Sequence, residues 1–233
     1  MFILTDLEGT TTSIHFVHKV LFPYFLNNLD RVARLYEAAE TQSEVSYAFS
    51  QIAETAQSEG TPLPRSIGDC LHYLETWTKS DRKHPALKSL QGMVWREGYE
   101  LGALKGHVYA DVLPALQRWQ AAGIGIGIYS SGSVAAQRLL VQHSELGDLR
   151  EYFSMYFDTA VGQKRQPLSY LNILATMSEQ PSDVLFLSDV EEELDAARSV
   201  GMQTLQLVRP EDGTVASSRH ATASSFASIL SNL

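Results

Sequence analysis

Residues 2–12 read Phe-Ile-Leu-Thr-Asp-Leu-Glu-Gly-Thr-Thr-Thr. The apolar run at residues 2–4 is long enough for a short buried strand, and two carboxylates, Asp6 and Glu8, follow it before Gly9 and three threonines. On a regular strand these two acids would share one face and repel each other, so either a metal cation neutralises them or the strand has already begun to turn. Both interpretations predict a site at the end of this strand.

The second half of the chain alternates between strand-like and helix-like patterns. Buried strands are expected at residues 123–129, 155–157, 184–187 and 203–208. Helices are expected at residues 112–122, 134–143, 169–177, 191–200 and, at the end of the chain, 226–233. Strands and helices that alternate at these lengths predict a doubly wound α/β fold with a mainly parallel sheet and helices on both faces.

The block between residues 14 and 105 is helical in pattern and contains no convincing strand. Trp77 and Trp95 fall at apolar positions of these helices, so we expect them in a helical core. The strand at the start of the chain has no other predicted strand near it in sequence with which to pair, so it is expected to join the later sheet. This predicts a Rossmann-like catalytic core, residues 1–13 and 106–233, interrupted by an all-helical cap, residues 14–105.

Composition limits the class of protein. The 233 residues carry 18 basic and 27 acidic side chains, a net charge of -9, which argues against a nucleic-acid or anionic-membrane partner. Cys70 is the only cysteine, so no intrachain disulfide and no cysteine zinc site can form. The N-terminus lacks a basic leader and no apolar run approaches a membrane span. We expect a soluble cytoplasmic protein.

Polar clusters follow several predicted strands at the edge where an open parallel sheet binds ligands. They are Asp6 with Glu8, Ser130 with Ser131, Lys164, and Ser188 with Asp189. Each has a plain alternative, because serine and aspartate commonly cap helices and a lysine is commonly solvated. The histidines at residues 15, 18, 84 and 107 are more simply packed or solvated than catalytic.

Together the clusters predict phosphoryl transfer. Asp6 would attack phosphorus to form an aspartyl-phosphate, and Glu8 would protonate the leaving oxygen and then activate water. Asp6 and Asp189 offer hard oxygen ligands suited to Mg²⁺, and Lys164 would neutralise phosphate charge.

The serines would complete the phosphate site. Ser130 and Ser131 would hold the non-bridging oxygens, aided by free N–H groups at the start of the helix that follows. Glu193, four residues beyond Asp189, could orient a metal-bound water.

These residues carry a resemblance to a known family. The set Asp6-x-Glu8-Gly9-Thr10, the strand ending at Ser130, Lys164, and Ser188-Asp189 with Glu193 resembles the haloacid dehalogenase superfamily of phosphatases. That family usually has aspartate in both acid positions of its first motif, and this chain has Glu8 in the second. The glutamate, the residues around it at 8–17, and the segments 21–24, 90–92 and 129–133 look like the acireductone-forming enolase-phosphatases of methionine salvage.

The resemblance implies an enzyme with one Mg²⁺ per subunit. It would convert 2,3-diketo-5-methylthiopentyl-1-phosphate, by enolisation and then dephosphorylation, to 1,2-dihydroxy-3-keto-5-methylthiopentene (acireductone) and phosphate. By motif match, the metal residues are Asp6, Glu8 and Asp189, where Glu8 can contribute its backbone carbonyl. The catalytic residues are Asp6, Glu8 and Lys164, and the substrate contacts are Ser130, Ser131 and Lys164. The expected partner is a small phosphate ester, and the expected state is a monomer.

Two other functions remain compatible with these residues. A phosphatase of the same superfamily could hydrolyse another small phosphate ester without an enolase step. A signalling receiver domain also gathers carboxylates, a hydroxyl and a lysine around Mg²⁺, although such a domain is compact and needs no insertion of roughly 90 residues.

Overall fold

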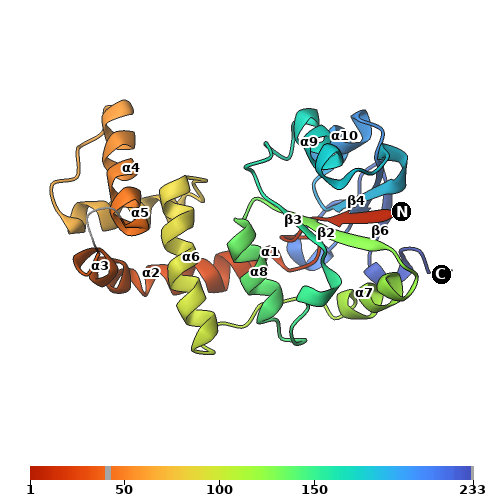
Figure 1. The fold of residues 1–233 in the computed structure, drawn as a ribbon, viewed down its shortest axis with the longest axis horizontal. Coiled ribbons are helices and arrows are strands. Elements are labelled where there is room, and N and C mark those ends of the chain that lie inside the picture. Colours follow the sequence, from red (N-terminus) through yellow and green to blue (C-terminus); the bar gives the residue numbers. More distant parts are fainter. Residues whose placement is uncertain (40–42, 232–233) are drawn as a thin grey trace. The chain divides into compact units, whose positions relative to one another are not determined.

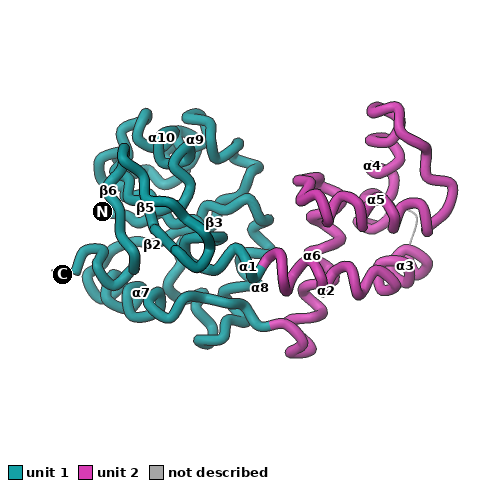
Figure 2. Tube along the Cα trace, turned by 180° about the vertical axis from the view of Figure 1, so that it is seen from behind, with its two compact units in different colours: residues 1–16, 105–233 teal, residues 17–104 magenta. Residues whose placement is uncertain are grey.

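The computed structural model describes residues 1–39 and 43–231 and divides the chain into two compact units. The first contains Met1–Phe16 and Lys105–Leu233, and the second contains Val17–Leu104 (Figure 2). The first boundary lies three residues later than predicted because Ile14–Phe16, helix α1, is tied to the first unit. The Asp212 carboxylate accepts the Ile14 N–H at 2.9 Å, and the Phe16 ring packs against His107. Within the described residues, no helix is both long and apolar enough to span a membrane.

The first unit is built on a six-stranded sheet with the order β3-β2-β1-β4-β5-β6, in which every pairing is parallel (Figure 1). The strands are β1 Phe2–Thr5, β2 Gly125–Tyr129, β3 Met155–Phe157, β4 Val184–Ser188, β5 Gln203–Leu207 and β6 Ala221–Ala223. The predicted parallel α/β sheet is confirmed. The strand order reverses between β1 and β4, so the carboxyl ends of β1, β2 and β4 meet where ligands bind in such sheets.

The central strands form because they are apolar on both faces. Every residue of β1 and β4 is buried, as expected for strands covered by helices on each side. Helices α9 Pro167–Met177 and α10 Glu191–Ser199 lie on one side of the strands, and α7 Val112–Ala121 lies on the other (Figure 1). Helix α8 Val134–Gln142 packs near β3 and the 3₁₀ turn Arg150–Tyr152.

Two elements at the end of the chain differ from the prediction. Strand β6 was missed because Ala221–Ala223 is a three-residue edge strand without an apolar run. The helix predicted at 226–233 is wrong, since the structure has only a 3₁₀ turn over Phe226–Ser228 and residues 232–233 lie outside the described chain. The carbonyls of residues 226, 227 and 229 accept bonds from Arg118, and Leu230 has a left-handed φ of 50°, so a helix cannot propagate.

The described residues of the second unit form helices joined by loops and contain no strand. After a π-helical turn, Val17–Leu21, it contains α2 Phe22–Leu26, α3 Leu29–Glu37, α4 Glu44–Ser58, α5 Ile67–Lys79 and α6 Pro85–Glu100. Ser66 and Asp69 form a capping box at the start of α5. Trp77 and Trp95 are buried in this unit, as predicted. His84 caps α6 and its ring packs at a tilt against Trp77, so it is a packed histidine.

Candidate active site

The loop after β1 turns back on itself immediately. The N–H groups of Thr10, Thr11 and Thr12 all donate to the carbonyl of Leu7, and Gly9 takes a left-handed φ of 82°. The two acids of the first motif are therefore not neighbours on a regular strand. The structure favours the second of the two interpretations of this motif, in which the strand has begun to turn.

Asp6 lies in a buried ion-pair network. Lys164 Nζ is 2.6 Å from Asp6 Oδ1 and 2.6 Å from Glu193 Oε2. Burial raises the pKa of Asp6 well above its usual value, Lys164 opposes that rise, and Glu193, Glu8 and Asp189 add to it. Burial also lowers the pKa of Lys164, but the two carboxylates outweigh it and hold that pKa above its usual range. Lys164 is therefore a fixed cation beside the acid.

Three hydroxyl groups hold the loop that carries Lys164. Tyr129 donates to the carbonyl of residue 162 at 2.9 Å, Ser169 to that of residue 163 at 2.6 Å, and Tyr170 to that of Lys164 at 2.7 Å. All three donors are buried, and they come from β2 and α9. Successive backbone carbonyls of the loop are thus anchored, and the lysine side chain is left to reach the acids.

Glu8 is held separately from Asp6. Its Oε2 accepts a hydrogen bond of 2.8 Å from Ser130 Oγ at the end of β2, and Ser130 Oγ in turn accepts the Gly132 N–H at 3.0 Å. Ser130 is fully buried and Ser131, which follows it, is half-buried. The hydroxyl that sequence assigned to phosphate therefore donates to the second acid of the motif.

The predicted phosphate contact with free N–H groups at the start of α8 is wrong for two of those groups. The Val134 N–H donates to Asp158 Oδ2 at 3.0 Å, and the Ala136 N–H donates to Ser133 Oγ at 3.2 Å. The reason is capping, since Ser133 is the N-cap and Asp158 reaches the helix from beyond β3.

Asp189 lies against the loop that follows β1. Thr10 Oγ1 donates to its Oδ1 at 3.2 Å and accepts its N–H at 2.9 Å. Burial raises the pKa of Asp189 to about 6, and Glu193 adds to the rise, while its own N–H, Lys164 and Thr10 act against it. An added Cβ on Gly9 would come within 2.6 Å of Asp189 Cγ, so glycine is required where the two segments meet.

The site carries more negative than positive charge. Asp6 interacts electrostatically with three further carboxyl groups, those of Glu8, Asp189 and Glu193, and Lys164 is the cation that contacts two of the four. Within the described residues, no three side chains of His, Cys, Asp or Glu are arranged to hold a metal between them. Mg²⁺ needs no such cage, because it keeps several waters and binds through one or two carboxylates and a substrate phosphate. The residues present fit Mg²⁺ on those terms.

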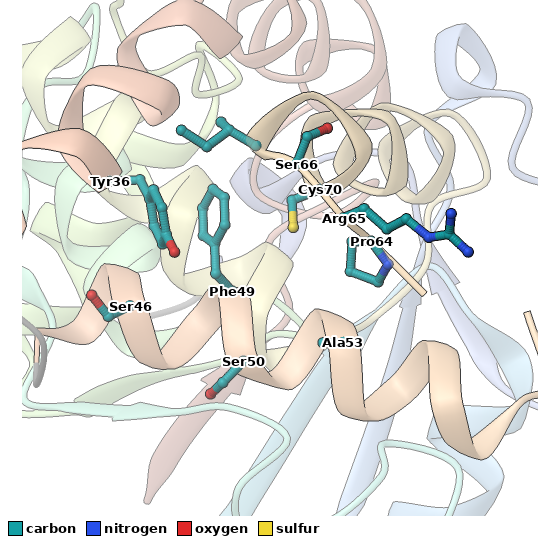
Figure 3. Close-up of a pocket in the computed structure, with 10 residues that line it drawn as sticks. Tyr36, Ser46, Phe49, Ser50, Ala53, Pro64, Arg65, Ser66 and Cys70 are labelled. Carbon is teal, nitrogen blue, oxygen red and sulfur yellow. The ribbon is translucent and has the colours of Figure 1, made fainter. Parts of the chain in front are cut away.

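A separate pocket of about 480 Å³ lies in the helical unit and has different chemistry (Figure 3). It is lined by the stacked rings of Tyr36 and Phe49, by serines, and by Pro64, Arg65 and Cys70. The described residues that line it include no carboxylate. Burial raises the pKa of the Cys70 thiol to about 11, so this sulfur is not a ready nucleophile.

Sequence reasoning missed part of the site. It placed Glu193 beside a metal-bound water, but the structure pairs Glu193 with Lys164 and with Ser188 Oγ, which donates to it at 2.9 Å. It gave no role to Thr10 or Tyr170. Thr10 could have been found from the sequence, because it is a hydroxyl residue directly after the glycine of the motif. Tyr170 could not, because the sequence shows it only as an apolar position of a predicted helix.

Comparison with known proteins agrees with this geometry. A family model described as haloacid dehalogenase-like hydrolase matches residues 2–201. A protein of Picosynechococcus named Enolase-phosphatase E1 is 47% identical over 231 residues, which cover 99% of this chain and 98% of that protein. The chain belongs to the enolase-phosphatases of the haloacid dehalogenase-like hydrolase family.

Other enolase-phosphatase relatives span the same length. An Enolase-phosphatase E1 of Cronobacter sakazakii is 47% identical over 96% of this chain and 94% of its own. Among solved structures, the UTR4 protein of Saccharomyces cerevisiae superimposes with a TM-score of 0.78 at 35% identity, over 97% of this chain and 98% of that one. The similarity therefore includes the helical unit of this enolase-phosphatase family member as well as its sheet.

Proposed function

We propose that this chain converts 2,3-diketo-5-methylthiopentyl-1-phosphate to acireductone and phosphate, by enolisation followed by hydrolysis through an aspartyl-phosphate. Full-length identity of 45 to 47% to proteins named Enolase-phosphatase E1 supports the choice of reaction. Residues 1–13 and 106–233 form the catalytic core in this proposal, and residues 14–105 form the cap. The monomeric state and cytoplasmic location remain predictions.

The observation that carries the proposal is the separate support of the two acids of the first motif. Asp6 is paired with Lys164, and Glu8 is held by the Ser130 hydroxyl. Because the two carboxyl groups have different partners, they can serve different roles, one as the nucleophile and the other as the general acid.

The phosphatase step follows from these placements. Asp6 attacks phosphorus, and Glu8 protonates the departing enolate oxygen as the P–O bond breaks. Glu8, now ionised, then takes a proton from water that attacks the aspartyl-phosphate, which releases phosphate and restores Asp6. Lys164 keeps its proton and lowers the repulsion between the Asp6 carboxylate and the phosphate oxygens. Ser131 contacts those oxygens, while the Ser130 hydroxyl donates to Glu8 and orients it.

Asp6, Asp189 and the backbone carbonyl of Glu8 would hold Mg²⁺. When bound, the ion supplies positive charge that keeps Asp6 ionised and polarises substrate oxygens. The raised pKa values of Asp6 and Asp189 support this assignment, because buried carboxylates without enough cations favour the protonated form. The Glu8 carboxylate already accepts from Ser130, which supports a metal contact through its backbone instead.

Glu8 also accounts for the enolisation step in this proposal. Its side chain is about 1 Å longer than aspartate, a difference in reach that matters in catalysis, and could contact the carbon-bound proton that is removed. Glu8→Asp tests the idea on the diketone phosphate. If enolisation persists at the wild-type rate while dephosphorylation changes, Glu8 is not the enolisation base.

The decisive experiment measures phosphate release together with the ultraviolet absorbance of the enediol product, with and without Mg²⁺. Both signals should appear only when Mg²⁺ is present. The rival phosphatase function, without an enolase step, predicts efficient turnover of a phosphate ester that cannot enolise. Good turnover of that ester with no enediol signal from the diketone would leave only the phosphatase assignment.

A further inference from the structure

A buried arginine lies beside the loop that follows β1 and has no part in the mechanism above. The Arg209 side chain, just beyond β5, is only 5% exposed. Its Nε and Nη2 both donate to the backbone carbonyl of Thr10, at 3.2 and 3.1 Å. Its Nη1 and Nη2 donate to the two carboxylate oxygens of Asp111, at 3.0 and 3.2 Å. The guanidinium therefore joins the catalytic loop to a carboxylate at the start of α7.

The position of the guanidinium is closely determined by its surroundings. Its carbon lies 4.0 Å from the centre of the Tyr109 ring and 5.5 Å from that of Phe226. Asp111 Oδ2 is itself fixed, since it accepts the Ser225 hydroxyl at 2.8 Å and the Phe226 N–H at 2.7 Å. A planar fork with donors on both edges suits this place, and the single ammonium of lysine cannot make the same four bonds.

Thr10 connects this arginine to the proposed metal site. Arg209 holds the carbonyl of Thr10, while the hydroxyl of Thr10 binds both the carboxylate and the N–H of Asp189. Thr10 is fully buried and its N–H is bonded to the Leu7 carbonyl, so its orientation depends on these contacts. A shift of the Thr10 backbone would move the hydroxyl and the carboxylate bound to it.

We propose that Arg209 is a positioning residue for the Mg²⁺ site, which acts through Thr10 on the carboxylate of Asp189. The inference rests on the proposed function, because it takes Asp189 as a metal ligand. Asp111 pairs the charge of Arg209, so the arginine acts by fixing a geometry and not by adding positive charge at the phosphate. Thr10 is one step beyond the proposed ligand, where replacement commonly changes metal affinity about 10- to 100-fold, so Arg209, one step further away, should have a smaller effect.

The first test compares two arginine-to-lysine variants by calorimetric titration of the metal-free protein with MgCl₂. Arg209→Lys should raise the Mg²⁺ dissociation constant several-fold, up to about tenfold, which is less than a direct partner of the ligand would change it. Arg198→Lys is the control at an exposed position, because Arg198 also donates to a backbone carbonyl, that of Arg219, and to a carboxylate, that of Asp195, outside the site. The control should bind Mg²⁺ as the wild type does. Equal dissociation constants for the two variants would overturn the inference.

A double-mutant cycle tests the route through Thr10. Thr10→Val removes the hydroxyl and should weaken Mg²⁺ binding, whereas Thr10→Ser keeps it and should restore most of the affinity. If Arg209 acts through Thr10, Arg209→Lys should add little to the dissociation constant of Thr10→Val. If the dissociation constant of the double variant rises by the product of the two single fold-changes, the two residues act independently and the proposed route is wrong.

A milder variant covers the case in which Arg209→Lys does not fold. Asp111→Asn leaves Arg209 in place and weakens its clamp, so it should also weaken Mg²⁺ binding. A folded Asp111→Asn protein with wild-type affinity for Mg²⁺ would then overturn the inference. Failure of the proposed function looks different, since the wild-type protein itself would not bind Mg²⁺.

Discussion

Replacing Gly9 by alanine should damage the metal site more than the fold. The residue has a left-handed φ of 82°, which costs alanine about 1–2 kcal/mol, or a melting temperature lower by about 2–8 °C in a protein of this size. The new Cβ would lie 2.6 Å from Asp189 Cγ and 2.9 Å from Oδ1, where ordinary contact begins at 3.4 Å. The carboxylate must therefore retreat by about 1 Å, and a displacement of that size can lower turnover about 100-fold.

Gly213→Ala separates the two effects. Gly213 has almost the same backbone angle, a φ of 81°, and no atom of the described chain lies within 4 Å of its added Cβ. Both variants should lose similar thermal stability from the backbone, measured by calorimetry without metal. Only Gly9→Ala should lose Mg²⁺ affinity and phosphate release. Equal Mg²⁺ affinity and turnover in the two variants would refute the reasoning that Asp189 must stay where Gly9 allows it.

Three further outcomes are expected. Protons compete with Mg²⁺ for Asp189, whose pKa is about 6 in the metal-free protein, and for Asp6, whose pKa is also raised. The apparent Mg²⁺ dissociation constant should therefore rise at least about tenfold from pH 7.5 to pH 5, and a flat titration series would contradict this. Ser130→Ala removes the hydrogen-bond donor to Glu8, so it should lower kcat at least about tenfold and leave the Mg²⁺ affinity unchanged. An unaltered kcat would count against Glu8 as the general acid. Phe186→Ala, in the fully buried centre of β4, should lower the free energy of unfolding by about 3–5 kcal/mol in urea titrations. Leu168→Ala, at a position that is 65% exposed, should lower it by less than about 0.5 kcal/mol. Similar losses in the two variants would show that the core is misassigned.

Local pattern was enough to predict the sheet and the main acids. The runs before Asp6 and Asp189 are short and apolar on both faces, as buried parallel strands are, and the topology of the sheet then brings their ends together. The strand Ala221–Ala223 has no such run, and its place at the edge depends on pairing with β5 alone. A pattern search cannot detect an element whose stability comes from its neighbour.

The partners of the site residues were harder to predict than the residues themselves. The bond from Ser130 to Glu8 joins positions 122 residues apart, and the bond from Asp158 to the start of α8 uses a carboxylate beyond β3. Both occupy groups that sequence had assigned to phosphate. Serine and glutamate were the right residue types for the site, but which group each would bond depends on tertiary contacts that carry no local signature.

The anchoring of the Lys164 loop by its own carbonyls determines which residues can vary during evolution or in a designed library. A carbonyl is common to all residues, so position 163 can change its side chain and keep the bond from Ser169. Gly162 is restricted for two other reasons. Its φ of 133° is one that other residues rarely adopt, and an added Cβ would clash with the Ser169 side chain. Residue 163 can therefore vary, whereas the three residues whose hydroxyl groups anchor the loop cannot: Tyr129, Ser169 and Tyr170.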